Sequence, residues 1–177
     1  DGHKLTFVRD MSSDGSTDLF SMDFHSPTRR LTDARGADLY PMYSPDGRQI
    51  AYTAYGYGNP EIYLMNSDGS EKHSLTQNSF ITNINPHPVW SADGKSVLFS
   101  DFANLDSLLS VPQNCADPCH DATQMLFNTN GLPLMTTSFI PLDQSRIFMA
   151  AFERTKNGGY GVYGLDSHTP NKPERLT

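Results

Sequence analysis

The chain has 177 residues and a formal net charge of −7. It contains no basic run, so we expect neither nucleic acid nor an anionic membrane surface as a partner. Charged residues make up 19% of the chain, against about a quarter in a typical globular protein, and small polar residues, glycine and proline fill the deficit. No apolar run approaches the roughly 18 residues of a membrane-spanning helix, and no long window has a helical period. The composition therefore favours a turn-rich, all-β protein without a transmembrane segment.

The first predicted strand covers residues 4–9 and directly follows an Asp-Gly pair at the start of the chain. A polar loop leads into a second strand over residues 18–23, and this segment ends at Leu31-Thr32. The opening Asp-Gly pair corresponds to a turn that recurs later, and the strand that should precede it is missing. We therefore expect the intact protein to be longer than this chain, or to be multimeric with a copy supplying the strand.

The loop between these two strands carries oxygen atoms at the spacing of a calcium-binding loop. Its positions 1, 3, 5 and 9 are oxygen-bearing and its position 6 is glycine, as in an EF-hand. The predicted ligands are Asp10, Ser12, Asp14, the carbonyl of Ser16, and Asp18. Position 12 departs from the EF-hand pattern, because a serine stands where a bidentate glutamate is expected. An ordinary loop with an Asp-Gly turn is the simpler interpretation.

The second segment opens with the pattern strand, tight turn, strand over residues 43–53. Its turn is Ser-Pro-Asp-Gly at residues 44–47, where proline presets φ, aspartate can bond its own backbone, and glycine can take a positive φ. A further strand over residues 61–66 closes on an Asp-Gly turn at residues 68–69. Leu75-Thr76 ends the segment, as Leu31-Thr32 ends the first.

Three residues in the next connections are candidate binding residues. Tyr55 and Tyr57 lie in a glycine-containing loop, which would make a flexible aromatic contact surface. The alternative is an ordinary hairpin loop whose tyrosines rest on neighbouring strands. His87 lies in the long connection over residues 77–89, and a lone hydrogen-bonding histidine is its simpler interpretation.

The third segment repeats the turn at residues 91–94, directly after the only tryptophan, Trp90, which we expect in the core. Where a later Asp-Gly turn is expected, the chain instead carries its only two cysteines, Cys115 and Cys119. Their isolation favours a disulfide between them and an oxidising compartment. Free thiols are an alternative. A metal site that includes His120 is another, although its spacing matches no common zinc pattern.

The fourth segment is the most diverged, with Pro-Leu-Asp-Gln at residues 141–144 and Leu-Thr at the end. The aspartate of the recurring turn stands at positions 1, 46, 93 and 143, at spacings of 45, 47 and 50 residues. A repeat of about 40–50 residues with four short strands is the signature of a β-propeller blade.

The repeated pattern resembles the TolB-like repeat, a WD40-like β-propeller family. It consists of the Ser-Pro-Asp-Gly turn, a strand, Glu-Ile-Tyr-Leu-Met, Asp-Gly-Ser and Leu-Thr, and it is most faithful over residues 43–76. The resemblance implies an all-β propeller of about four blades, each a four-stranded antiparallel sheet, with the first blade lacking its inner strand. We expect these blades at residues 1–36, 37–82, 83–131 and 132–177, as a single propeller or a propeller fragment.

The sequence indicates the function less directly than the fold, because one fold serves many functions. The sequence has no Gly-x-Ser-x-Gly elbow, no His-Glu-x-x-His and no glycine-rich phosphate loop, so we expect no enzyme. The resemblance implies a periplasmic or extracellular propeller that binds a protein partner or copies of itself, or that serves as a structural module. No cofactor is expected with certainty, and calcium is the only candidate. The alternatives are the propeller domain of a larger enzyme, either a serine peptidase or a sugar lyase, and a subunit of an extracellular filament joined by strand exchange.

Overall fold

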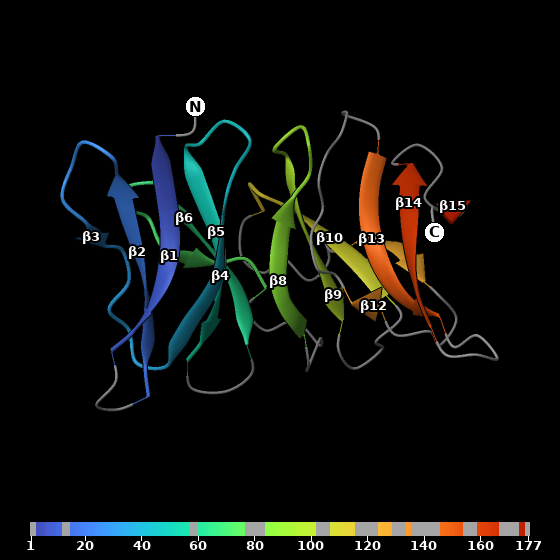
Figure 1. Cartoon of the computed structure of the whole chain (residues 1–177), viewed down its shortest axis with the longest axis horizontal. Helices are drawn as coiled ribbons and strands as arrows, with labels where there is room; N and C mark the ends of the chain where they lie inside the picture. The colour runs from blue at the N-terminus through green and yellow to red at the C-terminus, as the bar shows by residue number, and fades with distance from the viewer. Residues whose placement is uncertain are drawn as a thin grey trace.

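Every regular element that the computed structural model describes is a β-strand. The described residues are 3–11, 15–56, 60–76, 84–101, 107–115, 124–128, 134–135, 146–153, 159–166 and 174–175. Their strands form three hydrogen-bonded sheets that follow one another along the molecule in chain order (Figure 1). The predicted all-β fold class is therefore confirmed.

The first sheet contains two antiparallel sets of strands, which we call the first and second blades. The first blade consists of β1 (Lys4–Asp10), β2 (Thr17–Asp23) and β3 (Arg29–Arg30). The second consists of β4 (Ala37–Tyr43), β5 (Gln49–Tyr55), β6 (Glu61–Asn66) and β7 (His73–Ser74). The two blades join through one parallel pair, between Thr17 of β2 and Ala37 of β4. The described part of the first blade thus has three strands, with β1 at the end of the sheet.

The other two sheets are antiparallel and four-stranded, and we call them the third and fourth blades. The third consists of β8 (Ile84–Trp90), β9 (Ser96–Asp101), β10 (Ser107–Pro112) and β11 (Gln124–Asn128). The fourth consists of β12 (Leu134–Met135), β13 (Arg146–Glu153), β14 (Gly159–Asp166) and β15 (Glu174–Arg175). The blade boundaries expected from the sequence stay a prediction.

The Ser-Pro-Asp-Gly turn is held by its own side chains. Ser44 Oγ donates to Asp46 Oδ1 at 2.7 Å and accepts from the Gln49 backbone N–H at 3.0 Å. Gly47 closes the turn with a φ of 72°. The third blade repeats this arrangement, since Ser91 Oγ donates to Asp93 Oδ1 at 2.7 Å and accepts from the Ser96 N–H at 3.0 Å. The predicted positive φ at these glycines is confirmed, with 70° at Gly94.

The recurring Leu-Thr pair closes each of the first two blades. In the second blade, buried Leu75 donates its N–H to the Ile62 carbonyl at 2.7 Å, and Thr76 Oγ1 accepts from the Ile62 N–H at 2.9 Å. In the first blade, Leu31 and Thr32 make the same two contacts with Leu19, at 2.8 and 3.0 Å. The leucine therefore fills the core while the threonine hydroxyl satisfies a buried backbone donor.

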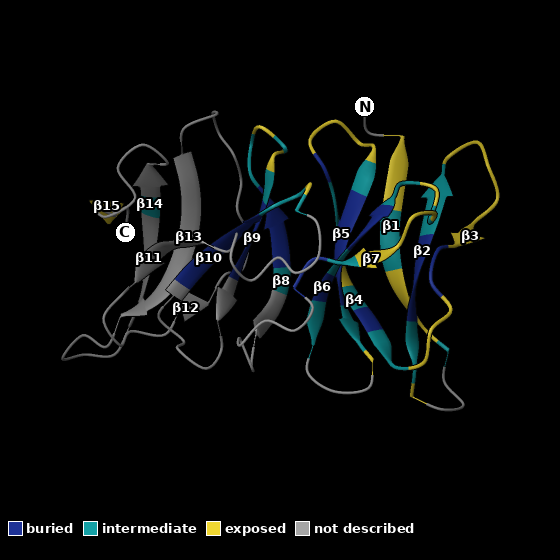
Figure 2. Ribbon diagram, turned by 180° about the vertical axis from the view of Figure 1, so that it is seen from behind, coloured by how far each residue is buried: buried dark blue, intermediate teal, exposed yellow. Residues whose placement is uncertain are grey.

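The core lies between blades rather than within one. Leu19 and Leu31 of the first blade pack with Ile50, Tyr52 and Met65 of the second. A larger cluster joins the second and third blades. Its buried members are Ala51, Ile62, Leu64, Leu75, Trp90, Val97, Phe99, Leu109 and Val111. Trp90 is buried, as predicted, and its Nε1 donates to the Met42 carbonyl at 3.1 Å. Figure 2 shows the buried positions along the central strands of these blades and the exposed ones on β1 and the loops.

Candidate functional site

A pocket of about 370 Å³ opens where the first blade meets the second. The connection between the two blades, residues 32–35, forms one side of it, and strands β4 to β7 form the other. Three acidic residues line it, namely Asp33, Asp38 and Glu61. We call it the Asp38 pocket, because Asp38 is its most buried acid.

The strand register explains why there is a hollow at this place. Asp38 pairs with Ala54, and Ala54 pairs with Glu61, so these three residues form one row across β4, β5 and β6. The small Ala54 side chain leaves room between the two carboxyl groups. A second row consists of Tyr52, Tyr63 and Ser74, and the rings of the two tyrosines lie 5.7 Å apart at 41°. Both rows line the pocket.

Asp38 is 5% exposed, and burial raises the pKa of its carboxyl group to about 6. The nearby Asp18 carboxylate raises this pKa further, while the Thr32 hydroxyl and the Lys72 ammonium group oppose the shift. Among the described residues, no cation lies within ion-pair distance of Asp38. Its carboxylate is therefore a buried negative charge without a paired positive charge.

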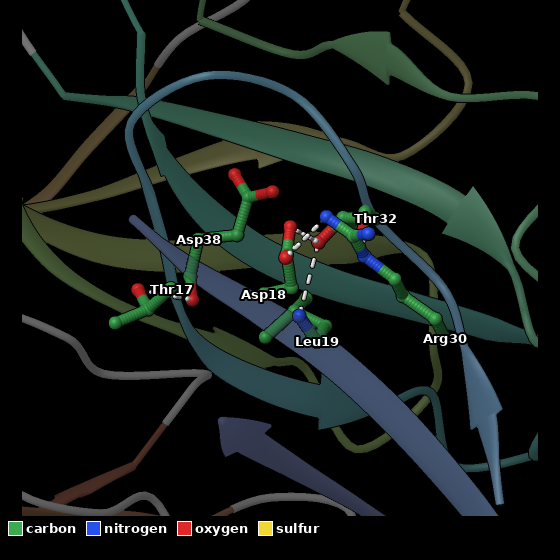
Figure 3. Close-up of polar contacts among 6 residues, drawn as sticks. All are labelled: Thr17, Asp18, Leu19, Arg30, Thr32 and Asp38. Carbon is green, nitrogen blue, oxygen red and sulfur yellow. Dashed lines mark hydrogen bonds and ion pairs between the residues drawn. The ribbon is translucent and has the colours of Figure 1, made fainter. Parts of the chain in front are cut away.

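Asp18, on the neighbouring strand β2, shows the contrasting arrangement. Its carboxylate is fully buried, accepts from Arg30 Nη2 at 2.6 Å, and accepts from Thr32 Oγ1 at 3.4 Å. Figure 3 shows this cluster beside Asp38, whose carboxylate is outside the drawn contacts. Two buried acids thus lie in adjacent blades, and only Asp18 has an arginine partner.

Burial also raises the pKa of three other groups in the pocket, one carboxyl and two tyrosine hydroxyls. Burial raises the pKa of Glu61, while the hydroxyl group of Thr76, which donates to the Glu61 carboxylate, opposes the shift. Burial likewise raises the pKa of Tyr52 and Tyr63, and the Asp38 charge adds to both shifts. These tyrosines therefore stay protonated at neutral pH and can donate or accept hydrogen bonds.

A second site feature lies at bulges in the first strands of the second and third blades. The register of β4 shifts between Leu39 and Met42, and Tyr40 within this bulge has a φ of 55° and is 41% exposed. The register of β8 shifts between Asn85 and Val89, around His87. The rings of Tyr40 and His87 meet edge to face, with centroids 3.8 Å apart at 85°. We call these two residues the Tyr40–His87 pair.

Two of the three predicted binding residues, His87 and Tyr55, lie in the described part of the chain. His87 belongs to the Tyr40–His87 pair and lies within β8, so its predicted place in a connection before the strand is wrong. Tyr55 ends β5 and is half-buried, and its pKa is raised by burial and, to a smaller extent, by Tyr40. Tyr57 lies outside the described residues. The sequence did not single out Tyr40, because its positive φ depends on a bulge that only the paired strand reveals.

The predicted calcium ligands are only partly described. Ser12 and Asp14 lie outside the described residues. The Ser16 carbonyl accepts from the Met11 N–H at 3.0 Å, and the Asp18 carboxylate binds Arg30, so two predicted ligand groups are already engaged. In the described part of the chain, no group of three His, Cys, Asp or Glu residues is arranged to hold a metal ion. The calcium site stays a prediction.

The predicted disulfide is also only partly described. Cys115 packs against the cluster between the second and third blades, and its N–H donates to the Pro112 carbonyl at 3.2 Å. Cys119 and His120 lie outside the described residues. The disulfide between the two cysteines stays a prediction.

The part of the chain that the structure describes has no helix with the length and apolarity needed to cross a membrane.

Comparison with known proteins identifies the repeat. The model of the TolB beta propeller domain matches residues 1–157. The uncharacterized protein Atu1656 of Agrobacterium fabrum is 33% identical over 105 residues, which cover 58% of this chain and 33% of that protein. The chain thus spans about a third of the length of this curated relative.

Solved structures agree on the fold. TolB from Acinetobacter baumannii has a TM-score of 0.74 at 22% identity, and the match covers 100% of this chain and 41% of TolB. The tricorn protease has a TM-score of 0.70 at 14% identity, with 99% of this chain and 21% of the protease covered. At these identities the likeness shows the fold alone, and the predicted β-propeller fold is confirmed.

Proposed function

The chain belongs to the TolB beta propeller domain family, and from this premise we propose that it is a non-enzymatic, protein-binding propeller of the periplasm. Among the described residues, the Tyr40–His87 pair is the observation that supports binding best. A bulky residue with a positive φ is strained, and such strain persists where the surrounding structure enforces it, often at functional sites. Here the strain holds an exposed aromatic ring against a histidine.

The position of the pair suits contact with a partner. Tyrosine is enriched at protein interfaces, because its ring gives a large apolar contact and its hydroxyl a hydrogen bond. β4 and β8 are each the first strand of a blade and lie in contact with each other. A partner that covers Tyr40 would therefore contact two blades at once, and nearby Tyr55 extends the aromatic surface.

Site-specific photo-crosslinking in the source cells tests this proposal. A benzoylphenylalanine at position 40 of the intact protein should form an adduct with one protein partner, identified by mass spectrometry, and His87→Ala should weaken that adduct. The control position is Phe24, which is 64% exposed and lies in the turn directly after β2. The absence of a protein adduct at position 40, or the same adducts at position 24, would refute the proposal.

A second candidate is the propeller domain of a larger peptidase. The fold likeness to the tricorn protease favours this candidate, because the match covers only 21% of that protease and the matching fold is thus one part of a larger chain. Labelling of the intact protein by a fluorophosphonate probe at a serine outside residues 1–177 would support this candidate.

A sugar-lyase domain and a filament subunit joined by strand exchange stay predictions. For the filament, the relevant feature is β1, which pairs only with β2 among the described strands.

A further inference from the structure

We propose that the Asp38 pocket binds the ammonium group of an alkylammonium ligand, with the Asp38 carboxylate as its counter-ion. This inference is independent of the protein-binding role, which uses the Tyr40–His87 pair. The pocket's volume of about 370 Å³ falls within the range of roughly 300–1,000 Å³ that small-molecule sites have.

The charge of the pocket is the first argument. A buried carboxylate is unfavourable unless a positive charge and hydrogen-bond donors accompany it. Asp18 meets this requirement through Arg30, at 2.6 Å. Asp38 is almost as deeply buried, yet no described cation lies within ion-pair distance of it. A ligand ammonium group would supply the charge that this site lacks.

The remaining pocket groups match the other needs of an ammonium ion. An ammonium group has three N–H donors and no acceptor. Besides Asp38, the pocket is lined by Thr32 and Ser74. The Thr32 hydroxyl group already accepts from Leu19 and donates to Asp18, whereas the buried Ser74 Oγ has no hydrogen-bond partner among the described residues. The rings of Tyr52 and Tyr63 form the adjoining surface, and tyrosine rings attract cations through their electron-rich faces.

The two cations of the pocket do not occupy this place. Arg35 and Lys72 line the pocket but are exposed. The Lys72 ammonium group donates to the Gly69 carbonyl at 2.7 Å. An ammonium ion that enters can therefore reach Asp38 without displacing an ion pair.

The experiment is a calorimetric titration of the intact protein with n-butylammonium, at pH 8. Wild-type protein should bind it, and Asp38→Asn should weaken binding by about tenfold or more, the loss expected when one partner of a buried charge pair is removed. The control is Glu174→Gln, which removes an exposed acid on β15, a residue that does not line the pocket, and should change affinity by less than about threefold. Neutral n-butanol should bind more weakly than n-butylammonium.

Two further arms identify the source of the ammonium group and test the charge state. An acetylated and amidated Gly-Lys-Gly peptide that binds wild type and is weakened by Asp38→Asn assigns the site to a protein side chain. Binding of butylammonium but not of the peptide assigns it to a free amine.

The affinity for butylammonium should fall as pH is lowered from 8 to 5, because Asp38 becomes protonated. The titratable and charged groups around Asp38 are Asp18, Asp33, Arg35, Glu61, Lys72, Tyr52 and Tyr63. Equal affinity of the wild type and Asp38→Asn, equal binding of butanol, or no binding of either amine would overturn the proposal.

Discussion

At the scale of single residues, Gly47 and Gly94 are the clearest test of the repeated turn. Both have a positive φ, 72° and 70°, which a residue with a Cβ adopts only at a cost. A Cβ added at Gly47 meets nothing within 4 Å, so the backbone alone should determine the effect. We expect Gly47→Ala and Gly94→Ala each to lower the free energy of unfolding by about 1 kcal/mol, measured by urea denaturation.

The control for these glycine variants is Gly56→Ala. An added Cβ at Gly56 also meets nothing within 4 Å, and its φ lies outside the left-handed region. It should leave stability unchanged within about 0.5 kcal/mol. A loss at Gly47 no larger than that at Gly56 would contradict the role assigned to the turn.

The second prediction at this scale concerns Asp38 and pH. Burial raises the pKa of Asp38 from 3.8 to about 6, so between these values the folded state holds a proton that the unfolded state has released. The free energy of unfolding therefore falls as pH rises through this range, and the loss is complete above the folded-state pKa. Asp38→Asn removes this loss. We expect the variant to be more stable than wild type at pH 8, by on the order of 2–3 kcal/mol, and to differ little at pH 4.

The comparison between wild type and Asp38→Asn separates the effect of Asp38 from that of acids whose pKa is lowered in the folded state. Hydrogen bonds from serine hydroxyls and backbone N–H groups lower the pKa of Asp46, Asp68 and Asp93. These acids contribute stability that is present at neutral pH and is lost as pH falls below their ordinary pKa. These acids are present in both wild type and Asp38→Asn, so their contributions cancel in the difference between the two free energies of unfolding. A difference between wild type and Asp38→Asn that does not vary from pH 4 to pH 8 would show that Asp38 titrates normally.

At the scale of elements, the strands and turns of the second blade could be predicted because their signals are local. The Ser-Pro-Asp-Gly turn is held by contacts among residues at most five positions apart. The Asp38 pocket could not be predicted in this way. Its residues come from four strands and a connection, and the row through Asp38, Ala54 and Glu61 exists only once the strand register is known. No spacing in the sequence marks these residues as neighbours.

The Leu-Thr ending of the blades could be predicted only in part. Its recurrence is visible in the sequence, but its reason is not, because the hydroxyl group of Thr76 acts on Ile62, 14 residues away. The same hydroxyl group donates to Glu61. The threonine thus joins the outermost strand of the blade to the strand beside it, and it also holds one of the pocket's acids.

Thr76→Val tests this closure, because valine keeps the shape of threonine and removes its hydroxyl group. The buried Ile62 N–H would lose its acceptor, so we expect the free energy of unfolding to fall by about 1–3 kcal/mol. The control is Thr6→Val on β1, where the side chain is half-buried and the change should be within about 0.5 kcal/mol. Denaturant titration of both variants measures the difference. Equal small effects would mean that the hydroxyl group of Thr76 does not stabilise the blade.

At the scale of the whole molecule, the described residues of the first three blades are joined mainly by apolar contacts. One parallel residue pair links the first and second blades. At this junction Gly36 approaches the second blade so closely that an added Cβ would lie 1.8 Å from the Tyr55 carbonyl oxygen. The second and third blades share one buried cluster and the hydrogen bond from Trp90 to Met42. A substitution in a shared cluster should therefore affect both blades.

Leu64→Ala is the sharpest test of this coupling. Leu64 lies on β6, is fully buried, and belongs to the cluster that contains Trp90 and Phe99 of the third blade. Removing a buried leucine side chain leaves a cavity, and we expect a loss of about 2–5 kcal/mol in the free energy of unfolding. Because the cavity faces both blades, native-state hydrogen exchange should show reduced protection in β5 and in β9 together.

Leu5→Ala serves as the matched control, since Leu5 on β1 is 50% exposed and its truncation should change stability by less than about 0.5 kcal/mol. If the Leu64 variant lost protection in β5 and β6 while β9 and β10 kept theirs, the two blades would unfold separately. The shared cluster would then stabilise each blade without coupling them. Parallel loss in both blades, with no change in the Leu5 variant, would establish that the second and third blades unfold together as one unit.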